Sequence, residues 1–212
     1  MSMENLPTPP CRMYGAEEVY GTSTWQTWGY IIVSIENRGA NAPRGREWRK
    51  CIYGEVGTFA SEDQQEASKT WHVNTLSLTP PRIGITGWSG GGSQTLNSMF
   101  RYPDVFHTGI AIAFVADQRL YDTVYQERYM NTPQNNPEGY RKGSPISYAA
   151  GLKGNLLLIH GTGDDNVHYQ NCEMLVNDWY GTEKSSHRFL TRCVPMEFTK
   201  ARNQLASAKD NG

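Results

Sequence analysis

Four short apolar segments recur along the chain and predict the strands of a parallel sheet. Each is a continuous run rich in Ile, Val or Leu rather than an alternation of apolar and polar residues. Continuous runs of this length are typical of strands that are buried on both faces. The four segments are YIIVSIE (30–36), RIGITG (82–87), GIAIAFV (109–115) and NLLLIHG (155–161).

Helical patterns separate these segments. SEDQQEASKTWHV (61–73) begins with Ser61 and has Gln64 three residues later, which is a capping-box pattern. SQTLNSMFRY (93–102) follows a run of glycines, and YQNCEMLVNDWYG (169–181) ends on a glycine suited to a helix C-cap. This alternation of strands and helices predicts an α/β fold with a mostly parallel, doubly wound sheet.

Length and composition fit one such domain and narrow the functional classes. A chain of 212 residues holds a single α/β domain, 1–212, in which residues 1–28 form an irregular or shortened N-terminal part. The formal net charge is -1 and charged residues make up 19%, so we expect no nucleic-acid partner. No apolar run approaches the roughly 20 residues of a membrane-spanning helix, and the N-terminus lacks the pattern of a signal peptide.

A serine between glycines follows the second apolar segment. Gly-Trp-Ser-Gly-Gly, residues 87–91, matches G-x-S-x-G and stands between a predicted strand and a predicted helix, as a nucleophile elbow requires. Such a turn exposes the Ser89 hydroxyl, and the Gly90 N–H at the helix start can stabilise an oxyanion. A phosphate-binding loop is the rival interpretation, but the segment fits neither GxGxxG nor GxxxxGK[ST].

A nucleophilic serine needs a base and a carboxylate that orients the base. The loop GTGDDN follows the last apolar segment, so Asp164 and Asp165 are expected at the same sheet edge as Ser89. A simple turn would also explain Asp and Gly in this loop. Only His168 and His187 follow these aspartates, and His168 is too close to them to lie on a separate loop. His187 is therefore the candidate base.

Three segments together resemble the catalytic domain of the dipeptidyl peptidase IV branch of the prolyl oligopeptidase family, in its bacterial form. They are the GWSGGG elbow, DQRLYDTVYQERYMNTPQNNPEGY (117–140) and SPISYAAGLKGNLLLIHGTGDDNVHYQN (144–171). The resemblance implies an α/β-hydrolase fold, here with fewer strands than usual. It also implies cleavage of peptides after a penultimate proline near the free N-terminus.

The resemblance assigns catalytic roles to individual residues. Ser89 matches the nucleophile and Asp164 the acid of the triad, with His187 as the histidine. The oxyanion hole would combine the Gly90 N–H with an upstream tyrosine hydroxyl. Tyr20 is the preferred tyrosine, and Tyr14 is the alternative.

The resemblance also assigns a substrate pocket. Asn166 matches the residue that binds the substrate carbonyl preceding the proline, and Arg128 matches an arginine near the substrate. Aromatic faces and branched aliphatic side chains suit the flat, apolar proline ring. The residues that match the walls of this pocket are Val115, Tyr121, Tyr125 and Val167.

The chain departs from the family pattern at several points. Gly90 stands where the family has the tyrosine of GWSYGG, and Gln118 stands where a tryptophan lines the pocket. In the family a helix and a strand precede the loop with the catalytic histidine, and the interval from Asn171 to His187 is short for both. RFLTRCVPMEF (188–198) resembles the family's terminal helix region. We expect no propeller domain in this chain.

These features predict a serine peptidase of the dipeptidyl peptidase IV type, acting on peptides with a proline near the N-terminus. A catalytically impaired remnant of such a domain and a small esterase-like serine hydrolase are the alternatives. The four cysteines are widely spaced, so no metal or cofactor is implied. Missing flanking strands would leave unpaired sheet edges, which favour a homo-oligomer. The resemblance suggests a periplasmic or cell-surface location in bacteria.

Overall fold

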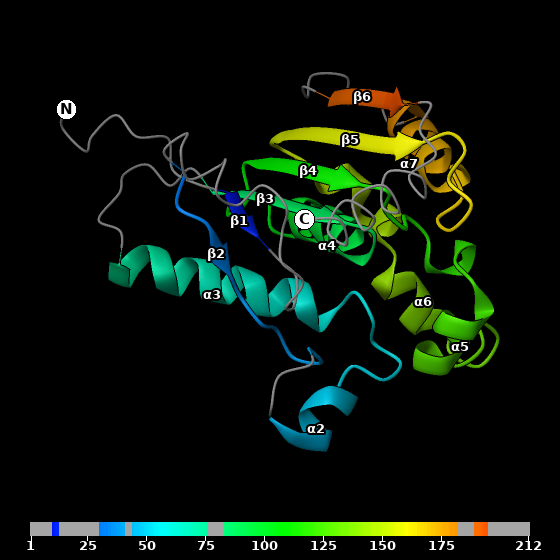
Figure 1. Ribbon diagram of the computed structural model, residues 1–212, viewed down its shortest axis with the longest axis horizontal. Coiled ribbons are helices and arrows are strands. Elements are labelled where there is room, and N and C mark those ends of the chain that lie inside the picture. The colour runs from blue at the N-terminus through cyan, green and yellow to red at the C-terminus, as the bar shows by residue number, and fades with distance from the viewer. Residues whose placement is uncertain (1–9, 13–29, 41–43, 76–82, 182–188, 195–212) are drawn as a thin grey trace, which may run out of the picture.

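The computed structural model describes residues 10–12, 30–40, 44–75, 83–181 and 189–194. In these residues, strands in the order β2-β1-β3-β4-β5-β6 form one sheet, and all neighbouring strands are parallel (Figure 1). The strands are β1 (Pro10–Arg12), β2 (Val33–Ser34), β3 (Gly84–Trp88), β4 (Thr108–Ile112), β5 (Asn155–Gly161) and β6 (Phe189–Val194). The predicted α/β fold with a small parallel sheet is thereby confirmed.

Helices connect the strands, and three of them coincide with the helical patterns of the sequence. These three are α3 (Phe59–Thr75), α4 (Gly90–Arg101) and α7 (Gln170–Gly181). Shorter helices that the periodicity did not indicate lie in the remaining connections, and α5 and α6 lie beyond the carboxyl ends of the central strands (Figure 1). They are α2 (Gly45–Lys50), η2 (Gln118–Leu120), α5 (Thr123–Met130), α6 (Pro137–Gly143) and η3 (Pro145–Gly151).

Two strands occupy segments that were not expected to form strands. Pro10–Arg12 pairs with both β2 and β3, within residues 1–28, which were expected to form an irregular or shortened N-terminal part. Phe189–Val194 pairs with β5 from Leu156 to Gly161, although RFLTRCVPMEF was expected to belong to a terminal helix. Phe, Thr and Val favour strands, and β5 offers them a parallel edge in register. β6 begins after position 187, so the described strand lies outside the interval from Asn171 to His187, which was expected to be short for both a helix and a strand.

Strand order places the elbow at a favourable position in the sheet. The strand order reverses between β1 and β3. From β1 the chain continues to β2 at one edge of the sheet, whereas from β3 it continues to β4 toward the other edge. In open α/β sheets, ligands bind outside the carboxyl ends of the strands at such a switch point. Ser89 follows β3 directly, at this edge.

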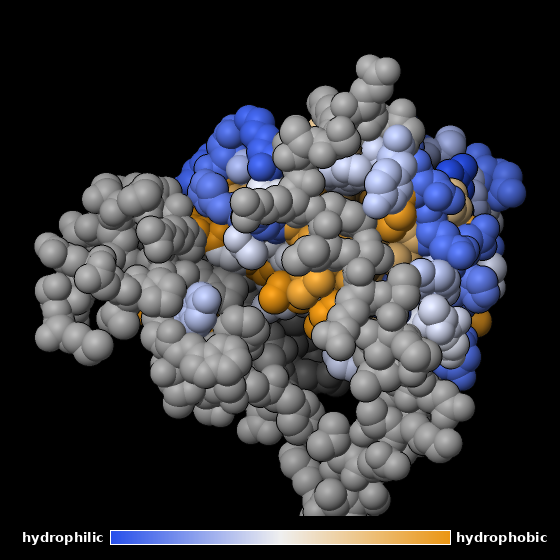
Figure 2. All heavy atoms as spheres, turned by 90° about the horizontal axis from the view of Figure 1, so that it is seen from above, coloured by the Kyte–Doolittle hydropathy of each residue, from blue (hydrophilic) through white to orange (hydrophobic). Residues whose placement is uncertain are grey.

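The core of the domain surrounds α4. All residues from Gly91 to Phe100 are buried, and Leu96 and Met99 pack into a cluster with residues from β3, β5 and α7. Because α4 is packed on all sides, it holds the elbow at its N-terminus in place. Viewed from above, apolar side chains gather in the middle of the described surface, between polar areas (Figure 2). The large side chains of the core cluster are Ile85, Leu96, Met99, Phe100, Phe106, Phe114, Leu152, Leu156, Leu158, Leu175 and Trp179.

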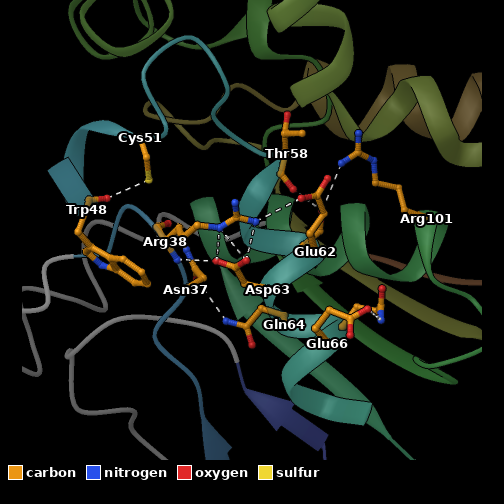
Figure 3. Close-up of polar contacts among 12 residues, drawn as sticks. Asn37, Arg38, Trp48, Cys51, Thr58, Glu62, Asp63, Gln64, Glu66 and Arg101 are labelled. Carbon is orange, nitrogen blue, oxygen red and sulfur yellow. Dashed lines mark hydrogen bonds and ion pairs between the residues drawn. The ribbon is translucent and has the colours of Figure 1, made fainter. Parts of the chain in front are cut away.

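An ion-pair cluster joins the loop after β2 to the start of α3 (Figure 3). The Arg38 N–H donates to Asp63 Oδ2 at 2.7 Å, and Arg38 Nε donates to Asp63 Oδ1 at 2.9 Å. The Arg38 guanidinium also lies 3.3 Å from the Glu62 carboxylate and above the Phe59 ring. Gln64 adds a bond from Nε2 to the Ile35 carbonyl at 2.8 Å. The first turns of α3 are thus anchored to the sheet. The capping-box interpretation is wrong, because Ser61 lies inside α3 and its hydroxyl donates to the Thr58 carbonyl at 2.8 Å.

Among the described residues, no helix is both long enough and apolar enough to cross a membrane.

Asp63→Ala is expected to lower the free energy of unfolding by about 1 to 2 kcal/mol, because charged hydrogen bonds to a backbone and a guanidinium group are lost at a partly exposed site. Urea denaturation at neutral pH measures the change. Glu138→Ala is the matched control: it removes an ion pair with Arg141 in which both side chains are more than half exposed. A control loss as large as that of Asp63→Ala would contradict the anchoring role.

Candidate active site

Ser89 occupies a strained backbone position between β3 and α4. Its φ is 55° and its ψ is -122°, a region that residues with a side chain rarely adopt. The Ser89 N–H donates to the Ile112 carbonyl at 2.9 Å, and the Ser93 N–H donates to the Ser89 carbonyl at 3.1 Å. The turn is therefore held between β4 and the first turn of α4, with the geometry of a nucleophile elbow.

The glycines of the motif are required by close backbone contacts. A Cβ atom at Gly87 would overlap the backbone of Gly91. A Cβ atom at Gly92 would lie 2.7 Å from the Ile112 carbonyl oxygen, closer than real Cβ contacts occur. The glycines of GWSGGG (87–92) thus reflect the tight packing of β3, β4 and α4 around the serine.

The residue after Ser89 is placed to donate a hydrogen bond. Gly90 is exposed and is the first residue of α4. N–H groups in the first turn of a helix have no acceptor within the helix, and the helix dipole favours negative charge there. One turn later, Ser93 Oγ accepts a bond from the Val115 N–H at 2.8 Å, which ties the elbow to the loop after β4.

Asp164 lies in the loop that follows β5, and its side chain is largely buried. Oδ1 accepts hydrogen bonds from the N–H groups of Asn166 at 3.0 Å and Val167 at 2.9 Å. Oδ2 lies 3.7 Å from Nε2 of His160 and makes no hydrogen bond to a residue that the structure describes. The carboxylate is therefore oriented by its own loop and keeps one oxygen for a further donor.

The sheet register brings the serine and the carboxylate loop to one edge. Trp88, Ile112 and Ile159 are aligned in β3, β4 and β5. Ser89 and the loop with Asp164 therefore leave the sheet on the same side. Two strand spacings separate β3 from β5, which amounts to about 10 Å. A histidine side chain from a third loop can bridge this separation.

A group of aromatic side chains lies beside the carboxylate loop. The Tyr121 hydroxyl donates to Asn166 Oδ1 at 3.0 Å, and burial together with the Asp122 charge raises the pKa of Tyr121. The Tyr121 and Tyr125 rings meet edge to face with 5.6 Å between centroids. The Asp122 side chain caps α5 by accepting the Tyr125 N–H. The structure thus brings together three of the predicted substrate residues.

The other predicted substrate residues are either buried or lie next to the aromatic group. Val115 and Val167 are 6% and 2% exposed, so both belong to the packed interior behind the edge. Arg128 lies on α5 with its guanidinium over the Tyr129 ring. Gln118 is buried and bonds to Gln126 and to the Gly143 carbonyl, away from solvent.

Two predicted residues, His187 and Tyr20, lie outside the described residues and stay predictions. The order along the chain bears on both. His187 precedes β6, whereas the family pattern places the histidine loop after the corresponding strand, and residues 195–212 contain no histidine. The alternative tyrosine, Tyr14, follows Arg12 by two positions in the sequence, and Arg12 ends a strand paired with β3.

Sequence reasoning missed two polar residues that support the site. Asn171 Oδ1 accepts the Ala116 N–H at 2.9 Å and so fixes the loop after β4. His160 is buried at the end of β5 and bonds to the Val167 carbonyl. A histidine in the apolar run NLLLIHG was the signal for the second residue. Among the described residues, no group of His, Cys, Asp and Glu could hold a metal ion.

A strained serine elbow on a parallel sheet, with a carboxylate loop at the same edge, defines the serine hydrolases of α/β type. Residues 19–195 match the model of the prolyl oligopeptidase family, and the chain belongs to this family. It is 42% identical over 154 residues to the probable dipeptidyl-aminopeptidase B of Ajellomyces capsulatus (strain H88), and 44% identical over 146 residues to that of Paracoccidioides lutzii. These alignments cover 71% and 68% of this chain.

The crystal structure of Porphyromonas gingivalis dipeptidyl peptidase 4 is similar over the whole chain. The TM-score is 0.80 at 31% sequence identity, and the match covers 100% of this chain. The chain spans 16% of the length of the two fungal relatives and 32% of the Porphyromonas structure. The expected fold and family are confirmed, including that the chain corresponds to only part of these proteins.

Gly87→Ala is expected to lower the free energy of unfolding by about 1 to 3 kcal/mol, because the new methyl group must displace backbone rather than a flexible side chain. Gly163→Ala, where nothing lies within 4 Å of the added Cβ, is the control and is expected to stay within about 0.5 kcal/mol of the unsubstituted protein. Urea denaturation followed by circular dichroism distinguishes the two. Equal stability of both variants would contradict the close contact at the elbow.

Proposed function

We propose that this chain carries the catalytic centre of a serine peptidase of the dipeptidyl peptidase type, with Ser89 as the nucleophile. The strained elbow is the observation that carries the proposal. Ser89 is one of three described non-glycine residues with positive φ, and strained residues of this kind cluster at active sites. Asp164 supports the proposal because its free oxygen lies at the same sheet edge.

The proposed reaction follows from these positions. Ser89 Oγ attacks the substrate carbonyl carbon while a histidine accepts its proton, and the same histidine then protonates the leaving amine. Asp164 Oδ2 would accept the other N–H of that imidazole. The Gly90 N–H and an upstream tyrosine hydroxyl, from Tyr20 or Tyr14, would hold the oxyanion. Water then releases the acyl group by the reverse steps.

The substrate proposed is a peptide with proline at its second position. The Tyr121 hydroxyl donates to Oδ1 of Asn166, so this amide presents its Nδ2–H₂ group as a donor. A substrate carbonyl is the matching acceptor. Tyr121 and Tyr125 offer aromatic surface for a proline ring. The names of the relatives, dipeptidyl-aminopeptidase and dipeptidyl peptidase, support release of dipeptides.

A second candidate function has an observation in its favour. His187 is the proposed base, but it precedes β6 in the sequence instead of following it. A chain in which no histidine reaches Ser89 would keep the sheet and the peptide pocket but lose turnover. Such a catalytically impaired domain would bind the same peptides without cleaving them.

A fluorophosphonate probe tests the nucleophile. We expect the unsubstituted chain to be labelled and Ser89→Ala to remain unlabelled, because the probe reacts with an activated serine hydroxyl. Ser147→Ala is the control, since it removes a hydroxyl that donates to the Arg141 carbonyl. His187→Ala is expected to slow labelling by a factor of about 10² to 10⁴ if His187 is the base.

Each result of the labelling experiment decides one statement. Persistent labelling of Ser89→Ala would refute Ser89 as the nucleophile. An unchanged rate in His187→Ala would refute His187 as the base. A folded, unsubstituted chain that is not labelled would establish the impaired domain in place of the peptidase.

Chromogenic dipeptide substrates test the pocket. We expect faster turnover of Ala-Pro 4-nitroanilide than of Ala-Ala 4-nitroanilide, and a loss of about 10-fold or more in kcat/KM for Asn166→Ala, because a buried substrate carbonyl loses its donor. Asn135→Ala, an exposed asparagine in another loop, is the control. Hydrolysis of 4-nitrophenyl acetate without turnover of either peptide would favour the esterase-like alternative.

A further inference from the structure

His160 is a buried polar residue outside the proposed catalytic triad. It is the penultimate residue of β5, and only 1% of its surface is exposed. β5 leads directly into the loop that carries Asp164 and Asn166. A contact that fixes the His160 ring therefore also restrains the start of this loop.

The hydrogen bond of the ring fixes its tautomer. Nε2 lies 2.8 Å from the Val167 carbonyl oxygen. A carbonyl oxygen only accepts, so Nε2 carries the hydrogen, and Nδ1 of the neutral ring is unprotonated. This bond joins the end of β5 to a residue seven positions later and closes the loop between them.

The same bond acts on the carboxylate. Val167 is held from both sides, because its carbonyl accepts from His160 and its N–H donates to Asp164 Oδ1 at 2.9 Å. The Asn166 N–H donates to the same oxygen at 3.0 Å. The His160 ring therefore holds the peptide groups that orient Asp164, and Asp164 Oδ2 lies 3.7 Å from His160 Nε2.

Aromatic rings on two sides hold the imidazole in place. Phe114, in the loop after β4, meets it edge to face with 5.2 Å between centroids. Tyr169, just before α7, meets it in the same way at 5.8 Å. Phe114 also packs against α4, since a Cβ atom added at Gly92 would lie 3.0 Å from the Cβ atom of Phe114. The ring thus connects the carboxylate loop to the helix that begins at the elbow.

The charge of His160 matters for Asp164. The titratable groups that face the ring are Asp164 in the loop, and His168 and Tyr169 before α7. Burial lowers the pKa of His160 and the charge of His168 lowers it further, against the Val167 bond and the Asp164 charge, which raise it. With its pKa below the usual value, the ring is neutral at pH 7 and does not form a charged ion pair with the Asp164 side chain.

We propose that neutral His160 is a positioning residue of the Ser89 centre. Its Nε2–H bond to the Val167 carbonyl sets the direction of Asp164 Oδ2 toward a histidine base and places Asn166 for the substrate carbonyl. The catalytic consequence rests on the proposed serine peptidase function, whereas the loop contact does not.

Nuclear magnetic resonance of the ring nitrogens tests the contact without any substitution. In the ¹⁵N-labelled chain at pH 7, we expect His160 to show a protonated Nε2 and an unprotonated Nδ1. We expect its titration to fall at lower pH than the ordinary range of a histidine, because burial lowers the pKa of His160. A ring protonated at Nδ1 alone, or a doubly protonated ring at pH 7, would overturn the proposal.

Two substitutions then separate positioning from packing. In His160→Gln, Nε2 is as many bonds from Cα as the imidazole Nε2, so the donor is kept. His160→Leu removes the donor.

We expect the Leu variant to react with a fluorophosphonate about 10- to 100-fold more slowly at Ser89, because a small misplacement of catalytic groups has effects of this size. The Gln variant is expected to stay near the unsubstituted rate, as is His107→Leu at the opposite sheet edge. Equal rates for the Leu variant and the unsubstituted chain, or equally slow Gln and Leu variants, would refute positioning.

Amide hydrogen exchange distinguishes failure of this proposal from failure of the proposed function. If Ser89 is not labelled at all, the N–H groups of Asn166 and Val167 still report on the loop. We expect both to lose protection in His160→Leu and regain it in His160→Gln, while the Ala113 N–H, bonded to Ile159 in the sheet, stays protected. Unchanged protection in the Leu variant would overturn the proposal.

Discussion

The close contact between β3 and the first turn of α4 is the constraint on which the candidate site depends. Gly87 and Gly91 approach so closely that a methyl group cannot fit, and Ser89 must turn through a positive φ to connect them. Strain of this kind costs about 1 to 3 kcal/mol. Burial of Leu96, Met99 and Phe100 on α4 contributes about 1.5 to 3 kcal/mol for each side chain. The core behind the serine therefore outweighs the strain.

The same sheet places the remaining groups with few further requirements. The carboxyl ends of parallel strands lie at one edge of the sheet, so the short loop after β5 begins at the same edge as the elbow. Asp164 is oriented by the N–H groups of its own loop, and the loop is closed by His160 from within the sheet. Tyr121 connects this loop to α5 through Asn166. A chain of hydrogen bonds thus connects the packed core to the exposed groups of the site.

Much of this arrangement could be predicted from the sequence. Continuous apolar runs indicated β3, β4 and β5, and the glycines around Ser89 indicated the elbow, because both patterns arise from local packing requirements. Strands β1 and β6 could not be predicted from an apolar run, since β1 has only three residues and β6, FLTRCV, contains Thr and Arg among its apolar residues; both form by pairing with a neighbour. Helices α5 and α6 depend on the capping side chains Asp122 and Asn136 rather than on an apolar stripe.

The candidate site shows the same division. Asp164 and Asp165 were indicated as acid candidates because a loop with two aspartates after a buried strand is a local signal, whereas the choice of Asp164 and the role of Asn166 came from the family resemblance. The inward bonds of Gln118 and the buried position of Val115 depend on contacts with residues far away in sequence, which no local pattern contains. The position of β6 matters most. His187 precedes this strand, whereas a catalytic histidine was expected to follow a strand.

Mass spectrometry of the folded chain after treatment with a fluorophosphonate tests the central claim most directly. The account predicts one covalent adduct per chain, on the peptide that contains Ser89, and no adduct after unfolding in urea. An adduct on another residue, or labelling of Ser89 that persists in the unfolded chain, would contradict it.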